Sequence, residues 1–214
     1  MSKQIEFELF SEQPYREFPY QVLPRDGDTQ YFGVVCNQDS SKRYLDYLLN
    51  EVPWKNDEAV IYGKHYITDR KVAWYGDGNF SYKYSGKTRV AIPWSKPLLE
   101  LRELVEKHSG ASYNSCLLNL YENGTQGMGW HHDDEKGLGE NSNIASLSFG
   151  AERRFDFRHK GSKEKIPILL EQGSLLVMAG TTQSNWQHHL PKTTKITQPR
   201  VNLTFRKMII RPLN

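Results

Sequence analysis

The spacing of apolar residues predicts two helices in the first half of the chain. In DSSKRYLDYLLNEVPW the apolar positions recur at helical spacing along one stripe: Leu45, Leu48, Leu49 and Val52. We expect Ser40 or Ser41 to cap this surface helix and Pro53 to end it. In WSKPLLELRELVEKHSG the same spacing recurs at Leu98, Leu101, Leu104 and Val105. Ser95 is the expected cap of this second helix, and Gly110 is its expected stop.

After the second helix the apolar period changes to two, which is the period of strands. The segments with this pattern are SCLLNLY (115–121), NIASLSFGA (143–151), RRFDFRH (153–159), GSLLVMAG (173–180) and RVNLTFRKMII (200–210). Residues 60–90 also have the pattern of strands and turns. Because no helical pattern separates these strands, we expect a mainly β fold with flanking helices (α+β). Its strands should form an antiparallel sandwich or barrel and not a doubly wound sheet.

Alternation also assigns side chains to the two faces of a strand. In RVNLTFR one face carries Arg200, Asn202, Thr204 and Arg206, and the other carries Val201, Leu203 and Phe205. If the arginines face inward, they require an anionic guest, because an unpaired buried guanidinium is costly. The reverse register, with the arginines in water, is the commoner arrangement for charged side chains. Asn119 and Tyr121 share a face in the same way, which suits either a carboxylate ligand or an ordinary polar surface.

Length and composition limit the class of protein. A chain of 214 residues can bury a core without disulfides, and we expect an extension at 1–35 and a single domain at 36–214. The chain has no apolar run long enough to cross a bilayer, and its start does not have the pattern of an export signal. Cys36 and Cys116 have no metal-like spacing, so we expect free thiols in a reducing compartment. These features predict an intracellular protein, cytoplasmic in a bacterium or nuclear in a eukaryote, and a monomer is the default expectation.

The net charge of +3 is too small to identify a partner, but the charge is unevenly distributed. Residues 192–207 contain five basic residues and no acid. Residues 153–165 contain six Lys or Arg residues and two acids. Both stretches fit a phosphate backbone, and both also fit solvated loops or strand faces.

The segment GMGWHHDDEKG contains two overlapping H-x-D pairs, His131 with Asp133 and His132 with Asp134. On a strand, H-x-D places two side chains on one face. A distant histidine would complete the set of two histidines and one carboxylate that binds iron(II) for oxygen chemistry. NWQHHL (185–190) offers two adjacent histidines, of which only one can face inward. Because a doubled HHDD is more often a solvated acidic turn, the residues alone leave both pairs open.

The motifs occur in a fixed order that resembles a known family. They are NLYENG, MGWHHDDE, IASLSFGAERRFDFRHK, GSLLVMAG, NWQHHLP and PRVNLTFRK. The sequence resembles the AlkB-type iron(II) and 2-oxoglutarate-dependent dioxygenases that repair alkylated bases, over about residues 60–208. VIYGKHY and YGDGNFSYKYSG are most similar to the branch that acts on double-stranded DNA. The resemblance implies a double-stranded β-helix (jelly-roll) core with N-terminal helices, a nucleotide-recognition lid at about 60–90, and Fe(II), 2-oxoglutarate and dioxygen as cofactors.

The resemblance also implies which residues bind the metal and the co-substrate. The implied metal ligands are His131, Asp133 and His188, so that His132 and His189 are bystanders. The implied 2-oxoglutarate residues are Arg200 at the distal carboxylate, Asn119 and Tyr121 beside it, and Thr204 and Arg206 nearer the metal. Arg206 would also steady the carboxylate of Asp133.

Further residues are implied for the substrate, which has to flip a base out of the helix. Tyr62, Gly63 and Lys64 are implied as the wedge that fills the vacated space. Tyr82, Lys83 and Tyr84 are implied in the lid, with Tyr84 stacking on the flipped base. Asp134 and Glu135 are implied to read its amino group.

The implied reaction is oxidative demethylation of 1-methyladenine or 3-methylcytosine in DNA, with RNA as a further partner. The co-substrate leaves as succinate and carbon dioxide, and the methyl group leaves as formaldehyde. One alternative is an oxygenase of the same fold that acts on RNA or protein. Another is a module that binds damaged DNA and has lost turnover.

Overall fold

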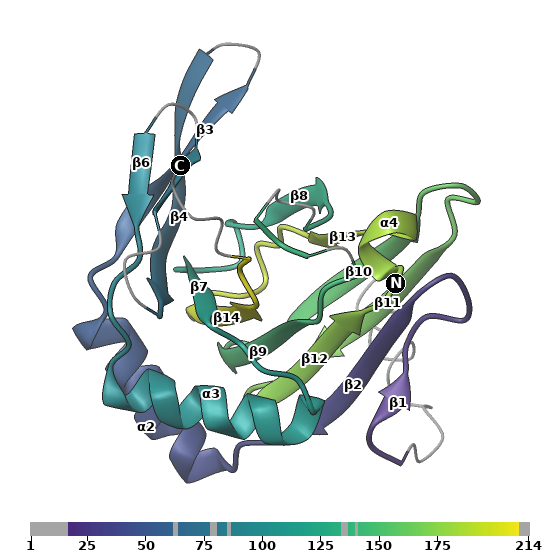
Figure 1. Ribbon diagram of the computed structural model, residues 1–214, viewed down its shortest axis with the longest axis horizontal. Helices are drawn as coiled ribbons and strands as arrows, with labels where there is room; N and C mark the ends of the chain where they lie inside the picture. Colours follow the sequence, from purple (N-terminus) through teal and green to yellow (C-terminus); the bar gives the residue numbers. More distant parts are fainter. Residues whose placement is uncertain are drawn as a thin grey trace.

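Two antiparallel sheets face each other in the computed structural model, which describes residues 17–61, 64–77, 81–84, 87–133, 137–139 and 141–209 (Figure 1). The larger sheet has the strand order β1 (Tyr20–Gln21), β2 (Asp28–Val34), β12 (Ser174–Ala179), β9 (Ile144–Gly150), β14 (Arg200–Arg206), β7 (Ser115–Tyr121), β4 (Lys64–Gly76) and β3 (Lys55–Ile61). The smaller sheet has the order β11 (Lys165–Leu170), β10 (Arg153–His159), β13 (Trp186–Leu190) and β8 (Met128–His131). This arrangement confirms the predicted mainly β fold of jelly-roll type.

The three described helices differ in length and position. They are α2 (Gln38–Glu51), α3 (Lys96–Ser109) and the short α4 (Thr182–Asn185). Helices α2 and α3 cover the outer face of the larger sheet, whereas α4 immediately precedes β13 (Figure 1). None of the helices in the described part of the chain is long and apolar enough to span a membrane.

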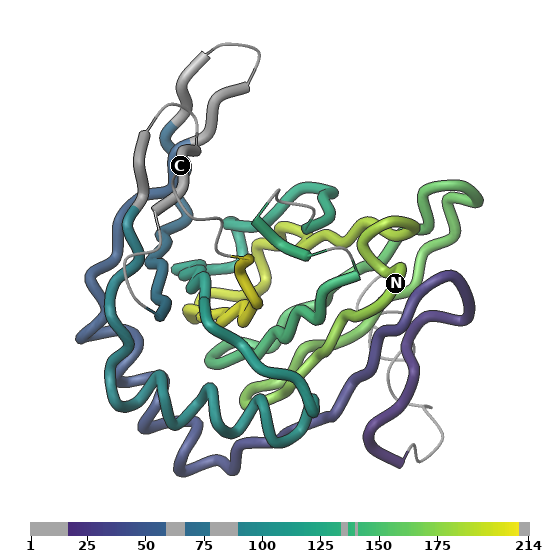
Figure 2. The backbone as a smooth tube through the Cα atoms, viewed as in Figure 1, coloured from purple at the N-terminus to yellow at the C-terminus, as the bar shows by residue number. Residues whose placement is uncertain are grey.

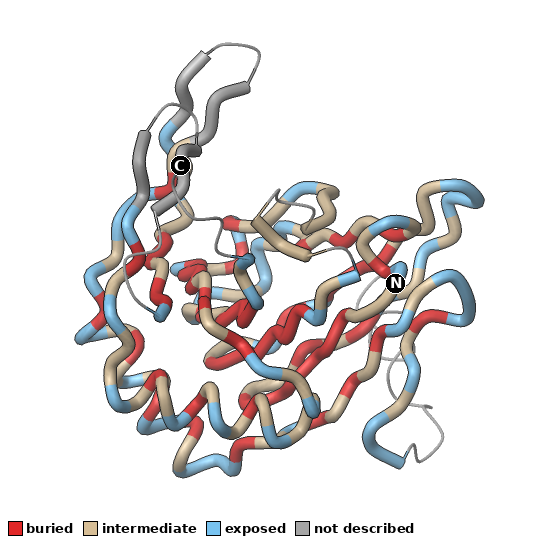
Figure 3. Tube along the Cα trace, in the orientation of Figure 1, coloured by how far each residue is buried: buried red, intermediate tan, exposed pale blue. Residues whose placement is uncertain are grey.

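The centre of the larger sheet is buried on both faces. Its outer face packs against α2 and α3 through a cluster that includes Leu48, Leu101, Leu147 and Leu203. A second cluster, which includes Ile144, Phe157, Met178 and Trp186, fills the space between the two sheets. The buried segments in Figure 3 follow these central strands. Strands covered on both sides can therefore carry a polar face that points into the protein and not into water.

Both predicted helices are confirmed, with one correction. Helix α3 starts after Ser95 and ends at Gly110, whose φ of 67° is the left-handed conformation that glycine adopts readily. Helix α2 begins after Asn37, whose side-chain oxygen accepts the backbone N–H of Ser40 at 2.9 Å. The prediction that Ser40 or Ser41 is the cap is therefore wrong. Ser41 is buried and its hydroxyl donates to the carbonyl of Cys36 at 3.0 Å.

The strand pattern located the central strands and missed several at the edges. Strand β11 was not predicted because KIPILL contains Pro167, which has no N–H to donate to the hydrogen bonds of a sheet. The structure places this strand at the edge of the smaller sheet, where proline is tolerated. Strand β2, which falls within the expected extension at 1–35, pairs with β12 in the larger sheet, so distant segments lie side by side (Figure 2).

The predicted lid region contains four strands. Strand β3 pairs with β4, and β4 also pairs with β7 in the larger sheet. Strand β5 (Ser81–Tyr84) pairs with β6 (Lys87–Val90) as a separate two-stranded sheet. Tyr62 and Gly63 lie outside the described residues. Lys64 begins β4, and Tyr82, Lys83 and Tyr84 lie in β5, but the description of these four residues extends only to the backbone.

Candidate metal and co-substrate site

Two strands of the smaller sheet bring the candidate metal ligands together. Strands β8 and β13 are antiparallel neighbours, and His131 lies directly opposite His188. Asp133 follows His131 by two residues, immediately after β8 ends. One ligand atom from each of these three side chains lies within 4.8 Å of the others. Of the two H-x-D pairs, the structure therefore brings His131 and Asp133 together with the distant His188.

The two imidazoles are held in orientations that suit metal binding. Nδ1 of His131 lies 2.8 Å from the carbonyl oxygen of Gly129. If Nδ1 carries the proton and donates it there, Nε2 has a free lone pair, and this atom lies 3.9 Å from Oδ1 of Asp133. His188 stacks on Phe155 with ring centroids 5.4 Å apart. Burial lowers the pKa of His188 to about 3, so its imidazole is neutral at ordinary pH, as a ligand must be.

Asp133 is an ionised carboxylate despite its burial. Burial opposes its ionisation, but the nearby guanidinium of Arg206 is the main influence that outweighs burial and lowers the pKa of Asp133. Nη2 of Arg206 lies 3.2 Å from Oδ2 of Asp133. This ion pair leaves Oδ1 on the side of His131, where a metal ion would bind.

Arg200 lies on β14 six residues before Arg206 and, unlike Arg206, is surrounded by neutral polar side chains. Its side chain is buried, and its Nη2 donates to Oγ of Ser148 and to Oδ1 of Asn202, both at 3.0 Å. Its Nε has no hydrogen-bond partner, and no carboxylate forms an ion pair with it among the described residues. Burial lowers the pKa of Arg200 to about 10, which still leaves the guanidinium charged at neutral pH. A buried cation of this kind requires an anionic ligand.

Strand β7 supplies the neighbouring wall of the site. Tyr121 lies directly opposite Arg200 in the β7–β14 ladder, and its ring lies 5.7 Å from the guanidinium carbon. Asn119 lies opposite Asn202, and its side-chain oxygen accepts a hydrogen bond from Nη1 of Arg70 at 3.0 Å. The amide nitrogen of Asn119 is therefore oriented away from Arg70.

The sequence analysis missed several polar residues at this site. They are Asp57, Arg70, Ser146, Ser148 and Asn202. Alternation already placed Asn202 on the same face as Arg200, and it would have placed Ser146 and Ser148 together on β9. Nothing in the sequence pattern indicated the buried ion pair between Arg70 and Asp57.

One cavity of about 360 Å³ contains both the triad and Arg200. Three ligand atoms for a metal lie at one end, and the buried cation of Arg200, which has no acidic partner among the described residues, lies at the other. Two histidines and one carboxylate leave coordination positions open, as iron(II) oxygenases require. The guanidinium suits a carboxylate geometrically. The residues present therefore fit iron(II) together with a small dicarboxylate.

The other residues singled out from the sequence are divided between the cavity wall, the outer face of the smaller sheet and positions outside the described residues. Thr204 accepts a hydrogen bond from Nδ2 of Asn202 at 2.9 Å and lines the cavity. His132, expected as a bystander, also lines the cavity wall. His189 lies on the outer face of the smaller sheet, where its ring stacks on Trp130 at 4.7 Å. Asp134 and Glu135 lie outside the described residues.

Comparison with known proteins agrees with this geometry. Residues 28–206 match the family described as the 2OG-Fe(II) oxygenase superfamily. The solved structure titled "The structure of OsALKBH1" superimposes with a TM-score of 0.61, at 14% identity, over 88% of this chain and 100% of that chain. At this identity the similarity supports the fold alone.

Relatives with higher identity narrow the assignment. Human "Alpha-ketoglutarate-dependent dioxygenase alkB homolog 3" is 41% identical over 172 residues, which is 76% of this chain and 59% of that protein. Human "DNA oxidative demethylase ALKBH2" is 42% identical over 158 residues, 70% of this chain and 60% of that protein. The Arabidopsis thaliana protein of the same name is 32% identical over 214 residues, 87% of this chain and 68% of that protein. The chain thus covers less than two thirds of either human protein.

This chain belongs to the 2OG-Fe(II) oxygenase superfamily and, within it, to the AlkB-type dioxygenases. Its family implies Fe(II), 2-oxoglutarate and dioxygen as cofactors.

Proposed function

We propose that this protein demethylates N-alkylated bases in DNA oxidatively, with 1-methyladenine and 3-methylcytosine as substrates, and so reverses alkylation damage directly. The observation that carries the proposal is the single cavity in which His131, Asp133 and His188 converge and Arg200 lies buried without an acidic partner among the described residues. Two of the relatives named above are called DNA oxidative demethylases.

The protein's own residues would bind and orient the reactants. His131, Asp133 and His188 would hold Fe(II), and Arg200 would bind the distal carboxylate of 2-oxoglutarate. Bound iron supplies the oxidation of the N-alkyl group by dioxygen, coupled to conversion of 2-oxoglutarate to succinate and carbon dioxide. Asn202 and Ser148 hold the guanidinium of Arg200 in place, and Arg206 holds the carboxylate of Asp133. Fixing these groups before the reaction reduces the entropy cost of aligning the co-substrate.

We further propose that DNA lies across the smaller sheet. The basic segment 153–165 forms β10 and the β10–β11 hairpin, where Lys163 and Lys165 are exposed. On the outer face of this sheet the guanidinium of Arg158 lies 4.3 Å from the ring centroid of Trp130. Lys192 and Lys195 are exposed in the segment after β13. Exposed cations of this kind would neutralise phosphates along the backbone.

The substrate residues in the lid remain part of the proposal. Tyr62, Gly63 and Lys64 would wedge the duplex, and Tyr82, Lys83 and Tyr84 would hold the flipped base. Asp134 and Glu135 would read its amino group. The separate two-stranded sheet of β5 and β6 supports the assignment of a distinct lid, which would lie beside the edge of the larger sheet formed by β3 and β4. We propose that the chain works as a monomer with a single dioxygenase domain.

The test is incubation with Fe(II), ascorbate and 2-oxoglutarate on matched oligonucleotides that carry one methylated base. Single-stranded DNA, duplex DNA and RNA versions of each sequence would be scored for loss of the methyl group by mass spectrometry. We expect demethylation of both DNA forms. Demethylation of RNA alone would support the alternative oxygenase, and binding of methylated DNA without succinate formation would support the module that lacks turnover.

A further inference from the structure

The backbone of Asp133 is held by a side chain from a distant segment. Strand β8 ends at His131, so the ladder with β13 does not extend to the N–H of Asp133. This N–H donates instead to Oε1 of Gln183, at 2.9 Å. Gln183 belongs to α4, which joins β12 to the strand that carries His188. A partly buried N–H that leaves a ladder requires such a partner.

We propose that Gln183 is a positioning residue for the metal-binding carboxylate of Asp133, a role that rests on the proposed iron site. The carboxylate has to direct Oδ1 toward His131 and Oδ2 toward Arg206, which lie 3.9 Å and 3.2 Å away. Holding the N–H fixes the backbone from which this side chain extends. Gln183 thereby acts on the metal through Asp133 and does not itself need to touch it.

Gln183 is itself anchored from two sides. Its Nε2 lies 3.5 Å from Sδ of Met178, and its backbone carbonyl oxygen accepts a hydrogen bond from Nζ of Lys160 at 2.9 Å. The adjacent Thr182 is buried, and its hydroxyl accepts the N–H of Asp28 at 2.9 Å and lies within donating distance of the backbone carbonyl oxygen of Ala179, at 2.7 Å. These contacts leave the amide of Gln183 little freedom to turn away from Asp133.

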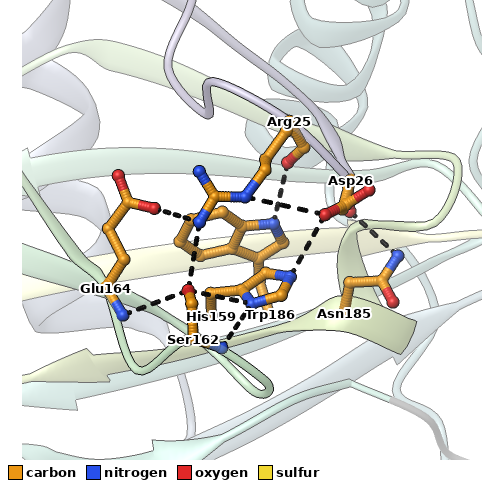
Figure 4. Close-up of polar contacts among 7 residues, drawn as sticks. All are labelled: Arg25, Asp26, His159, Ser162, Glu164, Asn185 and Trp186. Atoms are coloured by element: carbon orange, nitrogen blue, oxygen red, sulfur yellow. Dashed lines mark hydrogen bonds and ion pairs between the residues drawn. The ribbon is translucent and has the colours of Figure 1, made fainter.

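A cluster of polar residues anchors the end of α4 (Figure 4). Nδ2 of Asn185 donates to the carbonyl of Asp26 at 3.0 Å, and Nε1 of Trp186 donates to the carbonyl of Arg25 at 3.1 Å. Arg25 continues the chain of contacts to Glu164 in the β10–β11 hairpin. The β1–β2 loop and the hairpin therefore clamp the segment that joins Gln183 to β13.

His159 completes the cluster between the loop and the hairpin. Its Nε2 lies 3.3 Å from Oδ2 of Asp26, and its Nδ1 accepts the backbone N–H of Ser162 at 3.0 Å. Its ring lies edge to face with Trp186 at 4.9 Å. The cluster is thus continuous from the β1–β2 loop to the first residue of the strand that carries His188.

The test compares metal affinity, and not turnover, in four variants of the full chain. Mn(II) replaces iron(II) because it binds oxygen and nitrogen ligands and does not turn over, and its binding is measured by calorimetry. Gln183→Met keeps the length of the side chain and removes the acceptor, so we expect Mn(II) affinity about tenfold weaker than in the wild type. Gln183→Glu keeps an acceptor at the same position and should bind at least as tightly as the wild type. Gln187→Met is the matched control, because Gln187 accepts from Arg158 at 2.7 Å and makes no described contact with Asp133.

Several results would overturn the inference. Wild-type affinity in Gln183→Met would do so, and so would equal losses in Gln183→Met and Gln187→Met, which would indicate a general structural effect. If Gln183→Met does not fold, a tenfold loss in Gln183→Glu would by itself refute the acceptor role. Asp133→Ala is measured in the same series. If Asp133→Ala binds Mn(II) like the wild type, the proposed metal site fails, whereas the Gln183 results alone bear on the positioning role.

Discussion

At the metal end of the cavity the buried charges are paired, whereas at the other end a buried cation has no acidic partner among the described residues. Asp133 is matched by Arg206, and both belong to a local network that includes two histidines. The backbone of Arg200 lies about 20 Å from that of Arg206 along β14, by the usual rise per residue, and among the described residues its guanidinium has only neutral hydrogen-bond partners. The metal end is thus arranged before its ligand binds, while the Arg200 end gains most from a bound carboxylate. Variants at the metal end should therefore lose metal-dependent turnover, whereas variants at the Arg200 end should lose affinity for 2-oxoglutarate.

The largest effect is expected at the metal end, from Asp133→Ala. This change removes one of three metal ligands together with the ion pair that Arg206 forms with Asp133. We expect succinate formation to fall at least about 100-fold, since mutations in the surrounding shell already cost 10- to 100-fold. DNA affinity, measured by fluorescence anisotropy, should stay close to that of the wild type. Asp46→Ala on the exposed face of α2 is the control. Persistent turnover in Asp133→Ala would remove this residue from the ligand set.

The next largest effect is expected at the other end, from Arg200→Met. Removing one partner of a buried charge pair typically costs 2–5 kcal/mol, so we expect 2-oxoglutarate affinity to fall by about 100-fold. Affinity for Mn(II) alone should stay within about twofold, because Arg200 does not contact the triad residues in the described structure. Arg200→Lys should give an intermediate loss, since an ammonium keeps the charge but not the two-pronged geometry. Both affinities are measured by calorimetry, and equal losses of both would show that the two ends are not independent.

The same variant, Arg200→Met, should have a smaller effect on stability. Whereas it weakens binding of 2-oxoglutarate, it should stabilise the ligand-free fold. Arg200 buries a charge that the described residues do not neutralise, so Arg200→Met should stabilise the protein in the absence of ligands. We expect a rise in Tm of about 2–4 °C for each kcal/mol gained in a domain of this size. With Mn(II) and excess 2-oxoglutarate the order should invert, because only the wild type gains from binding the co-substrate. Thermal melts of both proteins with and without ligands test this inversion. A lower Tm of the ligand-free variant would mean that Arg200 is already compensated.

The sequence could predict the polar face of β14, which serves both ends, only in part. Alternation in RVNLTFR placed Arg200 and Arg206 on one face, but it could not decide whether that face points into the protein or into water. Both faces turned out to be buried, because helices cover one side of the sheet and the smaller sheet covers the other. The alternative with the arginines in water is therefore wrong. Periodicity describes a single strand, and the layers on either side of it depend on contacts between distant segments.

Contacts between residues far apart in the sequence could not be predicted from the pattern for the same reason. Gln183 lies 50 residues from Asp133, and no pattern in TTQSNW indicates a partner. The ion pair between Arg70 and Asp57 depends on the register of β3 against β4, where a bulge shifts the pairing. The cap at Asn37 was missed for a local reason, since three candidate residues follow one another closely and only the backbone conformation selects among them.

The smallest effect is expected from Thr204→Val. This variant removes a contact that positions Asn202 beside Arg200 and leaves Arg200 itself in place. Thr204 accepts from Nδ2 of Asn202, and this contact orients Oδ1 of Asn202 toward Arg200. Valine keeps the branched shape that suits a strand and removes the acceptor. Loss of one neutral hydrogen bond is worth about 0.5–1.5 kcal/mol, so 2-oxoglutarate affinity should fall by about 2- to 10-fold.

The expected loss in Thr204→Val is well below that in Arg200→Met, because the cation itself remains. The exposed Thr181 provides a matched control, as Thr181→Val should leave 2-oxoglutarate affinity unchanged. A loss in Thr204→Val as large as that in Arg200→Met would show that Arg200 depends on Asn202 for its position entirely. In that case the polar face of β14 binds the co-substrate as one unit. The two ends would then differ in which residues hold the arginine in place, and not in whether its charge is paired.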